Sequence, residues 1–406
     1  RQMCIRDSFY PSVGLSWVPS STWDLGNAFS YLKLRGSIAS VGLPFPRFLT
    51  TPTYEYDATG KIWKDKTHYP IGDLKPERTI TYEVGIDARL WKNISLSASW
   101  YSADTKNQTF DPALPPSSSY TTIYLQTGHV RNTGVELSLG YSNQWRDFGW
   151  SSNFTFSWNK NEIVDLASGA LNPVTGQPLN LSELDIKGLG KAKYILKQGG
   201  TLGDLYTTSD LKFNDNGYVE VDKAGNLLLT DEGEQIYLGS VFPSENLAWR
   251  NDFRYKGINL GLLFTGRIGG ICYSATQANM DLYGVSEVSA AARDAGGVLI
   301  NGREMVDAQK WYQAIGSQSG LPQYYTYSAT NFRLQELSLG YTLPRKWFRN
   351  KMVLTVSFVG RNLWMIYCKA PFDPEAVAST GLSYQGIDYF MMPSLRSLGF
   401  NVKFEF

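Results

Sequence analysis

Few of the side chains that usually carry catalysis or bind metals occur in this chain. Its 406 residues include two histidines, His68 and His129, and three widely separated cysteines, Cys4, Cys272 and Cys368. Most zinc sites and most Ser/His or Cys/His nucleophiles need imidazole or thiolate groups. An odd number of distant cysteines is more consistent with small apolar residues than with a disulfide framework. We therefore expect no metal site and no cofactor.

Paired carboxylates would offer acid–base chemistry instead. The candidates are Asp204 with Asp210, Glu232 with Glu234, and the FDPE segment at 372–375. Nothing in their spacing fixes a geometry. The acidic segment FNDNGYVEVDKAGN (213–226) lacks the ligand spacing of a calcium loop, so turn chemistry is its expected role. The glycine-rich pieces GTLGDL and GRIGG are not followed by Lys-Ser/Thr, which excludes phosphate loops. We expect no catalytic residue and no enzyme.

Aromatic and charged residues supply two candidate sets for binding. The aromatic set lies in a long segment between strand-like stretches and comprises Trp311, Tyr312, Tyr324, Tyr325 and Tyr327. Such rings can stack on sugars or on a capping partner, or they can simply pack the loop. The charged set comprises Glu83, Asp87, Arg89, Glu136, Arg267, Arg361 and Lys403. On the polar face of a strand these charges can form solvated ion pairs among themselves.

The elements that must position these residues have a two-residue period. TYEVGIDARL (81–90) places Tyr82, Val84, Ile86, Ala88 and Leu90 on one face and polar residues or glycine on the other. A strand directs successive side chains to opposite faces, so this pattern predicts a strand with one apolar face. The same alternation occurs in ISLSASWYS, VELSLGYS, FGWSSNFTFSWN and INLGLLFTGRI. Aromatic residues at 14% and 38 glycines also favour an all-β fold, and a net charge of +1 gives no case for nucleic-acid binding.

Eleven strands of this kind are predicted. They lie at about 9–18, 30–41, 79–90, 94–104, 132–142, 148–160, 246–255, 258–269, 331–342, 351–364 and 395–406. Most exceed the usual five or six residues of a globular strand and match the roughly 9–11 tilted residues of a transmembrane strand. No stretch of about 18 apolar residues predicts a transmembrane helix.

The predicted connections alternate strictly between short and long. Short ones fall at 19–29, 91–93, 143–147, 256–257 and 343–350; long ones fall at 42–78, 105–131, 161–245, 270–330 and 365–394. Short turns at one end and long loops at the other are typical of an outer-membrane β-barrel. In hydrocarbon every backbone polar group must be paired, so strands persist there only in a closed barrel.

Three local features stay open at this level. In NFRLQELSLGY, Leu337 and Leu339 share a face that Phe332 and Leu334 do not, which indicates a bulge near Gln335 or a later strand start. YVEV and NLLL within 161–245 can form a small hairpin. The aromatics Tyr101, Tyr141, Trp158, Tyr341 and Trp364 are expected near strand ends, at the lipid headgroups.

An ordered set of phrases resembles one family. PERTITYEVGIDARLWKNISLSASWY, RNTGVELSLGYSNQWRDFGWSSNFTFSWNKNEI, RYKGINLGLLFTGRIGG and NFRLQELSLGYTLPRKWF, followed by VSFVGRNLWMI and FDPE, resemble the SusC/RagA-type TonB-dependent outer-membrane transporters of Bacteroidota. The opening FYPSVGLSWV…YLKLRGSIASVG fits the same family, so the resemblance runs from Phe9 to Phe406.

The resemblance implies a transmembrane antiparallel up-and-down barrel of about 22 strands with a plugged lumen. In such a barrel the seven charges named above could contact the plug or line a solute path, with solvated ion pairs as the alternative. Residues 9–406 would be its C-terminal half, with signal peptide, plug, TonB box and first barrel half upstream. Eleven strands alone would expose two edges and should not be stable in a membrane. Residues 1–8 lack the alternation and are interpreted as a possible non-native tail.

The resemblance also implies a function and partners. The expected activity is import of glycans or oligosaccharides, or of peptides, across the bacterial outer membrane, under a SusD-like surface lipoprotein and with energy from the TonB–ExbB–ExbD complex. The C-terminal FNVKFEF resembles the signal that the barrel-assembly machinery reads, with Phe400, Val402, Phe404 and Phe406 facing lipid; an ordinary amphipathic strand is the alternative. A passive porin and a secreted adhesin or glycan-binding module are the other functions that the pattern allows.

Overall fold

The computed structural model describes residues 9–44, 54–65, 68–69, 75–110, 120, 122–166, 177, 181–230, 233–381 and 384–406. The expected tail at 1–8 lies outside these residues. Within the described part of the chain, no helix has both the length and the apolar character needed to cross a membrane.

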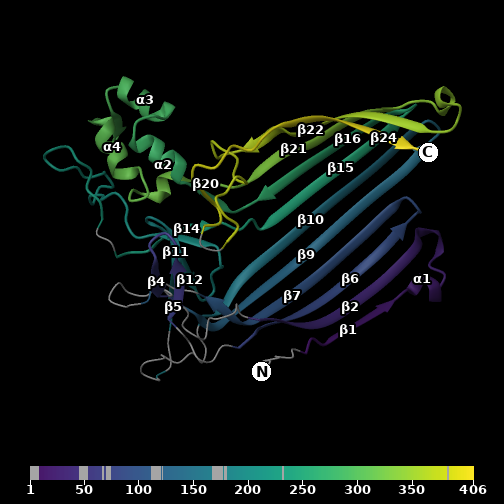
Figure 1. Ribbon diagram of the computed structural model, residues 1–406, viewed down its shortest axis with the longest axis horizontal. Coiled ribbons are helices and arrows are strands. Elements are labelled where there is room, and N and C mark those ends of the chain that lie inside the picture. The colour runs from purple at the N-terminus through teal and green to yellow at the C-terminus, as the bar shows by residue number, and fades with distance from the viewer. Residues whose placement is uncertain are drawn as a thin grey trace.

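Eleven strands form one antiparallel sheet in which spatial order follows chain order. They are β1 (Ser12–Trp17), β2 (Phe29–Leu43), β6 (Glu77–Leu90), β7 (Ile94–Phe110), β9 (Leu125–Trp145), β10 (Phe148–Asp165), β15 (Glu245–Tyr255), β16 (Ile258–Ile268), β21 (Asn331–Thr342), β22 (Val353–Cys368) and β24 (Ser397–Glu405). Figure 1 shows the strands side by side in a curved, open sheet, with β1 and β24 at its two edges. The eleven predicted strands and their order are therefore confirmed, and the barrel is not closed within this chain.

Cross-strand register keeps the two faces apart. Val84, Trp100, Val135 and Trp158 are successive partners across β6, β7, β9 and β10 on the apolar face. One residue away, Glu83, Tyr101, Gly134 and Asn159 are successive partners on the polar face, here called the inner wall. Large apolar side chains on the other face remain exposed, as Val84 at 60% shows. A closed barrel would present that face to lipid and the inner wall to its lumen.

β7, β9 and β10 run furthest beyond the predicted bounds and span 17, 21 and 18 residues. The added residues include Phe110, Val130 and Ile163, which are buried in one cluster with residues of the long loops. Packing against the loops therefore stabilises strand pairing beyond the predicted strand ends. The expectation that Tyr101 and Trp158 lie near strand ends is wrong, and Tyr101 belongs to the inner wall.

A bulge at Gln335 explains the irregular face of β21. Glu336 pairs with Leu263 and Leu334 with Phe264, so Gln335 has no partner on β16. The register with β22 also shifts there, where the Gln335 side chain donates to Asn362 Oδ1 at 2.8 Å. The extra residue returns Leu334 to the face of Leu337, which selects the bulge over a late strand start.

The short connections lie at one end of the sheet and the long ones at the other (Figure 1). Between β15 and β16, Lys256 and Gly257 have φ values of 47° and 90°, as a two-residue hairpin turn requires. The turn end also carries α1 (Pro19–Thr22), η1 (Gly26–Ala28) and η3 (Arg345–Phe348). The predicted sorting of connections by length is confirmed.

Parts of three long connections fold into a packed unit, here called the loop domain, made from residues 181–230, 233–244, 270–330, 369–381 and 384–394. Its strands and helices are β11 (Glu183–Leu189), β12 (Ala192–Lys197), β13 (Asp204–Thr207), β14 (Ile236–Ser240), β17 (Ile271–Ser274), α2 (Ala275–Leu282), α3 (Glu287–Asp294), β18 (Val298–Ile300), β19 (Glu304–Val306), α4 (Ala308–Ile315), η2 (Pro322–Tyr325), β20 (Thr326–Ser328) and β23 (Ile387–Asp388). Four further short strands, β3 (Tyr54–Asp57), β4 (Ile62–Asp65), β5 (His68–Tyr69) and β8 (Thr122–Ile123), belong to the other long connections.

The loop domain has its own core. Tyr194, Leu205, Tyr273, Leu321 and Ile387 are buried in one cluster although they come from three different connections. Ser274, Ser286 and Asp307 accept backbone hydrogen bonds at the N-termini of α2, α3 and α4, which satisfies donors that helix starts leave free. YVEV and NLLL do meet in an antiparallel bridge, Val221 with Leu227, which confirms that small hairpin.

Candidate functional site

The inner wall carries the predicted charges. Register places all seven of them, on β6, β9, β16, β22 and β24, on the polar face of the sheet: Glu83, Asp87, Arg89, Glu136, Arg267, Arg361 and Lys403. Whether they contact a plug or solute stays a prediction, but their partners within the wall are defined.

The first ion-pair group joins β2 to β6. Arg35 forms an ion pair with Glu83, and its Nε lies 3.6 Å from Asp87 Oδ2. The Ser97 hydroxyl donates to Asp87 Oδ1 at 2.7 Å. Arg35 can lie flat here because its neighbour across the strand is Gly85, where a Cβ would come within 2.7 Å of the Arg35 Nε. Two carboxylates therefore share one guanidinium, so these three groups together keep one net negative charge on this part of the wall.

A second group crosses β15, β21 and β22. Arg250 Nε lies 2.9 Å from Asp252 Oδ2, and Arg250 Nη1 lies 3.6 Å from Glu336 Oε1. Arg361 Nε donates to Glu336 Oε2 at 3.1 Å. Glu336 reaches both arginines because it lies on the same polar face as Arg250 and Arg361.

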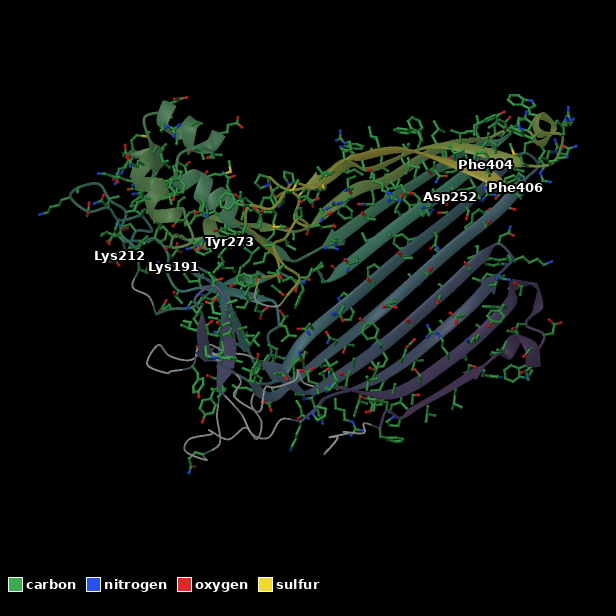
Figure 2. All side chains as sticks on the ribbon, viewed as in Figure 1. Lys191, Lys212, Asp252, Tyr273, Phe404 and Phe406 are labelled. Carbon is green, nitrogen blue, oxygen red and sulfur yellow. The ribbon has the colours of Figure 1, made fainter. Side chains whose placement is uncertain are left out.

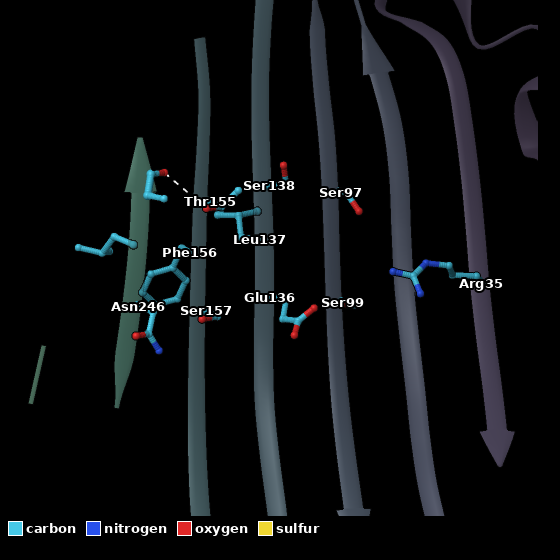
Figure 3. A pocket seen from close by; sticks show the side chains of 12 residues that line it. Arg35, Ser97, Ser99, Glu136, Leu137, Ser138, Thr155, Phe156, Ser157 and Asn246 are labelled. Carbon is cyan, nitrogen blue, oxygen red and sulfur yellow. Dashed lines mark hydrogen bonds between the residues drawn. The ribbon is translucent and has the colours of Figure 1, made fainter. Parts of the chain in front are cut away.

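Between these groups, Glu136 lies in a groove of about 350 Å³. Small polar residues from neighbouring strands surround it: Ser97, Ser99, Ser138, Thr155, Ser157 and Asn246, with Arg35 at one side. Figure 3 shows Glu136 extending from β9 toward Ser99 across the open polar surface. Within the described part of the chain, Glu136 has no ion-pair or hydrogen-bond partner. The groove therefore offers hydroxyl and amide groups and one carboxylate to whatever occupies the lumen.

The other predicted charges differ in their surroundings. Lys403 pairs with Glu405 two residues further along β24, whereas Arg89 forms no ion pair with a described residue. Arg267 Nε lies 3.5 Å from Glu375 Oε1, and Arg333 Nη2 lies 3.1 Å from the same oxygen. Glu375 belongs to FDPE, so this motif fastens a loop to the wall. Asp204 and Asp210, paired in the sequence analysis, have different partners: Asp204 accepts a hydrogen bond from Thr201 and Asp210 accepts one from Gln323.

The aromatic set lies in or against the core of the loop domain. Tyr312 and Tyr325 are buried, and Trp311 and Tyr324 pack against the same cluster, with their rings 6.1 Å apart. Tyr327 contacts the Phe372 ring edge-on at 5.9 Å. The contacts of these five aromatic residues are therefore those of loop packing, which was one of the two roles considered for them. A ligand contact remains a prediction and is geometrically open for Tyr312, which lines a pocket.

Burial also suppresses ionisation in the loop domain. It raises the pKa of the Cys272 thiol to about 12, with Cys368 and nearby carboxylates adding to the effect. Burial likewise raises the pKa of Tyr273, which Figure 2 places in this domain. A thiol and a phenol that stay protonated at neutral pH are poor nucleophiles. These groups therefore support packing, not covalent chemistry.

The sequence missed Arg35, Arg250, Asp252, Glu336 and Arg333, and it singled out Asp373 only as a candidate for acid–base chemistry within FDPE. The first three lie at polar positions of predicted strands and could have been found by extending the alternation rule. Glu336 and Arg333 flank the bulge, where the face of each residue was ambiguous. Asp373 required knowledge of how the last long loop folds.

Similarity to known proteins decides the family. The family described as "TonB dependent receptor-like, beta-barrel" matches residues 5–249. The chain belongs to this family. The TonB-dependent receptor P3 of Formosa agariphila is 24% identical over 98% of this chain and 42% of its own length. The TonB-dependent receptor SusC of Bacteroides thetaiotaomicron is 20% identical over 82% of this chain and 32% of its own length.

Solved structures agree on the fold. The RagAB peptide importer in its "closed-closed" state superposes with a TM-score of 0.70 at 19% identity, covering 98% of this chain and 43% of that one. Its "open-open" state gives 0.65 at 17% identity, with 98% and 42% covered. The chain therefore spans about two-fifths of the length of these relatives. The predicted SusC/RagA relationship and the outer-membrane β-barrel fold are confirmed, and the family is one of outer-membrane receptors.

Proposed function

We propose that this chain is the C-terminal barrel half of a TonB-dependent importer of neutral oligosaccharides. The observation that carries the substrate class is the inner wall. Its charges are mostly paired internally, and hydroxyl and amide groups fill the space between them. Such a surface exchanges hydrogen bonds with an uncharged polar oligomer without leaving buried charges unpaired.

The remaining parts of the proposal follow the family. The upstream half would supply the other strands, a plug and a TonB box; TonB–ExbB–ExbD would supply energy and a SusD-like lipoprotein would cover the loop domain. Two observations support this. Nearly all of this chain matches a relative over about two-fifths of that relative's length. The sheet also has two edge strands, β1 and β24, that are not paired with each other. The printed description of RagAB as a peptide importer makes peptides the competing cargo.

An uptake experiment on the complete protein tests the proposal. Cells that express it or lack it would receive fluorescent oligosaccharides and fluorescent peptides, each with and without a protonophore. We expect protein-dependent oligosaccharide uptake that the protonophore abolishes. Uptake that survives the protonophore would indicate a passive pore, and peptide-only uptake would overturn the substrate class. Recovery of the protein in the soluble fraction would favour a secreted binding module.

The unpaired carboxylate gives a site-specific arm. Glu136→Lys places a cation in the central groove, which would face the plug or a passing solute. We expect uptake to fall while surface expression is unchanged. Glu304→Lys makes the same charge reversal at an exposed loop position and serves as the matched control. Equal uptake by the two variants would exclude the groove from the transport path.

A further inference from the structure

A pocket of about 210 Å³ lies among α2, α3 and α4, away from the inner wall. α2 contributes Asp281 and the turn that follows it, α3 contributes Ser289 and Arg293, and α4 contributes Gln309 and Tyr312. Figure 1 shows these three helices together on the loop domain at the end of the molecule opposite the short turns. The pocket therefore lies on the loop side of the protein.

The floor of the pocket is polar and buried. Asp281, Ser289 and Tyr312 are 4%, 1% and 7% exposed. Asp281 Oδ1 accepts hydrogen bonds from Gln277 Nε2, at 2.7 Å, and from the Ser286 hydroxyl. The buried Tyr325 hydroxyl also lies beside this carboxylate, and burial together with the Asp281 charge raises the pKa of Tyr325. Among the described residues, no cation pairs with Asp281. An ionised carboxylate offers about four acceptor sites, so these contacts leave acceptor capacity for a ligand.

The rim combines an aromatic ring with donors. Tyr283 is 76% exposed at the end of α2. Arg293 Nη1 donates to the Gly284 carbonyl at 2.5 Å, so the guanidinium lies over the rim. Glycine permits this approach, because a Cβ at position 284 would lie 2.5 Å from Nη1 and the backbone there has φ +66°. Gln309, exposed at the start of α4, adds an amide that both donates and accepts.

The mixture of groups selects a neutral ligand. Asp281 disfavours an anion and Arg293 disfavours an ammonium, whereas vicinal hydroxyls can donate to the carboxylate and accept from the guanidinium and amide. The exposed Tyr283 ring offers a flat apolar face with a polar tip. The volume lies below the roughly 300–1,000 Å³ of pockets for drug-sized ligands, which limits the ligand to about one ring.

We propose that this pocket is a binding site for a single sugar unit on the loop surface, floored by Asp281 and rimmed by Tyr283, Arg293 and Gln309. The site lies outside the lumen, so it neither requires transport nor results from it. It would hold a glycan at the cell surface, and its occupancy is independent of which cargo crosses the barrel.

Direct binding to the complete detergent-solubilised protein tests the site. Saturation-transfer NMR would use methyl α-glucoside, α-galactoside and α-mannoside as probes, with propylammonium and propionate as charged controls. We expect saturable binding of at least one glycoside and of neither ion. Failure of all three glycosides to bind, or preference for either ion, would overturn the proposal.

Variants assign the binding to this pocket and not to the lumen. Tyr283→Ala and Gln309→Ala change exposed rim residues and should each weaken the bound glycoside by about fivefold, as the loss of one aromatic contact or hydrogen bond predicts. Tyr218→Ala removes another exposed tyrosine of the loop domain, outside the pocket, and should bind as the parent does. Unchanged binding in both rim variants would overturn the site, whereas import measured separately could succeed or fail in either case.

Discussion

The guanidinium of Arg333 meets both carboxylate oxygens of Asp373, with Nη1–Oδ2 and Nη2–Oδ1 distances of 3.0 and 2.8 Å. The two side chains are only 6% and 9% exposed. Asn331 Oδ1 accepts from Arg333 Nε at 3.2 Å, so the guanidinium is held on several sides. A bidentate, shielded pair of this kind fixes geometry. It ties the loop between β22 and β24 to β21, at the mouth of the barrel wall.

Breaking this pair should release the loop. Removing one partner of a buried ion pair typically costs 3–5 kcal/mol, because the other charge is left unpaired. We expect Arg333→Met to increase hydrogen exchange across 369–396 in the complete protein. Lys193→Met removes an exposed pair with Asp185, where about 0–1 kcal/mol is typical, and should leave exchange near its parent level. Equal protection of the loop in both variants would contradict the tether.

The same pair should make loop closure sensitive to acid. Burial raises the pKa of the Asp373 carboxyl, but hydrogen bonds from Arg333, Ser394 and the Glu375 backbone outweigh burial and hold that pKa below its usual value. A lowered carboxyl pKa stabilises the closed loop above the unfolded value of about 3.9, and this stabilisation is lost as pH falls further. Hydrogen exchange of 369–396, corrected for intrinsic rates, should therefore rise below about pH 4. Arg333→Met should abolish most of that dependence; an unchanged dependence would assign it to other groups.

Gly134 should tolerate no side chain. Tyr101 covers it from β7, and a Cβ at 134 would lie 2.5 Å from the Tyr101 ring and 2.6 Å from the Trp158 carbonyl oxygen. The Tyr101 hydroxyl, which donates to Asn159 Oδ1 at 3.1 Å, would be displaced. We expect Gly134→Ala to destabilise the barrel by about 1–3 kcal/mol, as overpacking does. Urea titration of the folded barrel, which is distinguished from the unfolded chain by its altered gel mobility before boiling, would measure this change in stability. Gly36→Ala is the control, since its nearest atom lies at an ordinary 3.8 Å, and a similar midpoint shift in both variants would refute the packing argument.

Much of the sheet was predictable because the face of each residue in a barrel strand follows from the local sequence. Alternation alone assigns Val84 and Glu83 to opposite faces, and the short turns then set the order of the strands. Phe332 and Leu334 depart from the alternation of Leu337 and Leu339. The sequence was consistent with either a bulge or a later strand start and could not decide between them. The choice depended on the pairing of Glu336 with Leu263, which is a contact between distant segments.

The loop domain was not predictable in the same way. Tyr194, Tyr273 and Ile387 come from three connections and meet in one core, and no periodicity within any single connection reveals that meeting. The added lengths of β7, β9 and β10 have the same origin, because loop packing extends strands that the membrane alone would have ended. The pocket beside Asp281 likewise depends on three short helices whose relative placement is tertiary.

Phe406 should matter for assembly more than for stability. It is 97% exposed at the end of β24 and has no packing contact to lose within the described sheet (Figure 2). If the terminal strand is read by the barrel-assembly machinery, Phe406→Ala should lower the amount of folded protein in the outer membrane without changing the urea midpoint of the fraction that folds. Trp347→Ala removes another exposed aromatic at the turn end and should assemble normally. Equal assembly of both variants would favour an ordinary edge strand.

Two neighbouring positions on β9 should separate the lipid face from the lumen. Leu139 lies on the apolar face, 44% exposed, and pairs with Leu96 and Phe154. Ser138 lies on the inner wall in the groove beside Glu136. An arginine on the lipid face near the bilayer midplane costs about 2–4 kcal/mol, whereas lumen positions tolerate charge. We expect Leu139→Arg to lower the free energy of unfolding by that amount in lipid vesicles, and Ser138→Arg to change it little, because Glu136 supplies a counter-charge on the same face. A larger loss for Ser138→Arg would mean that the two faces had been assigned the wrong way round.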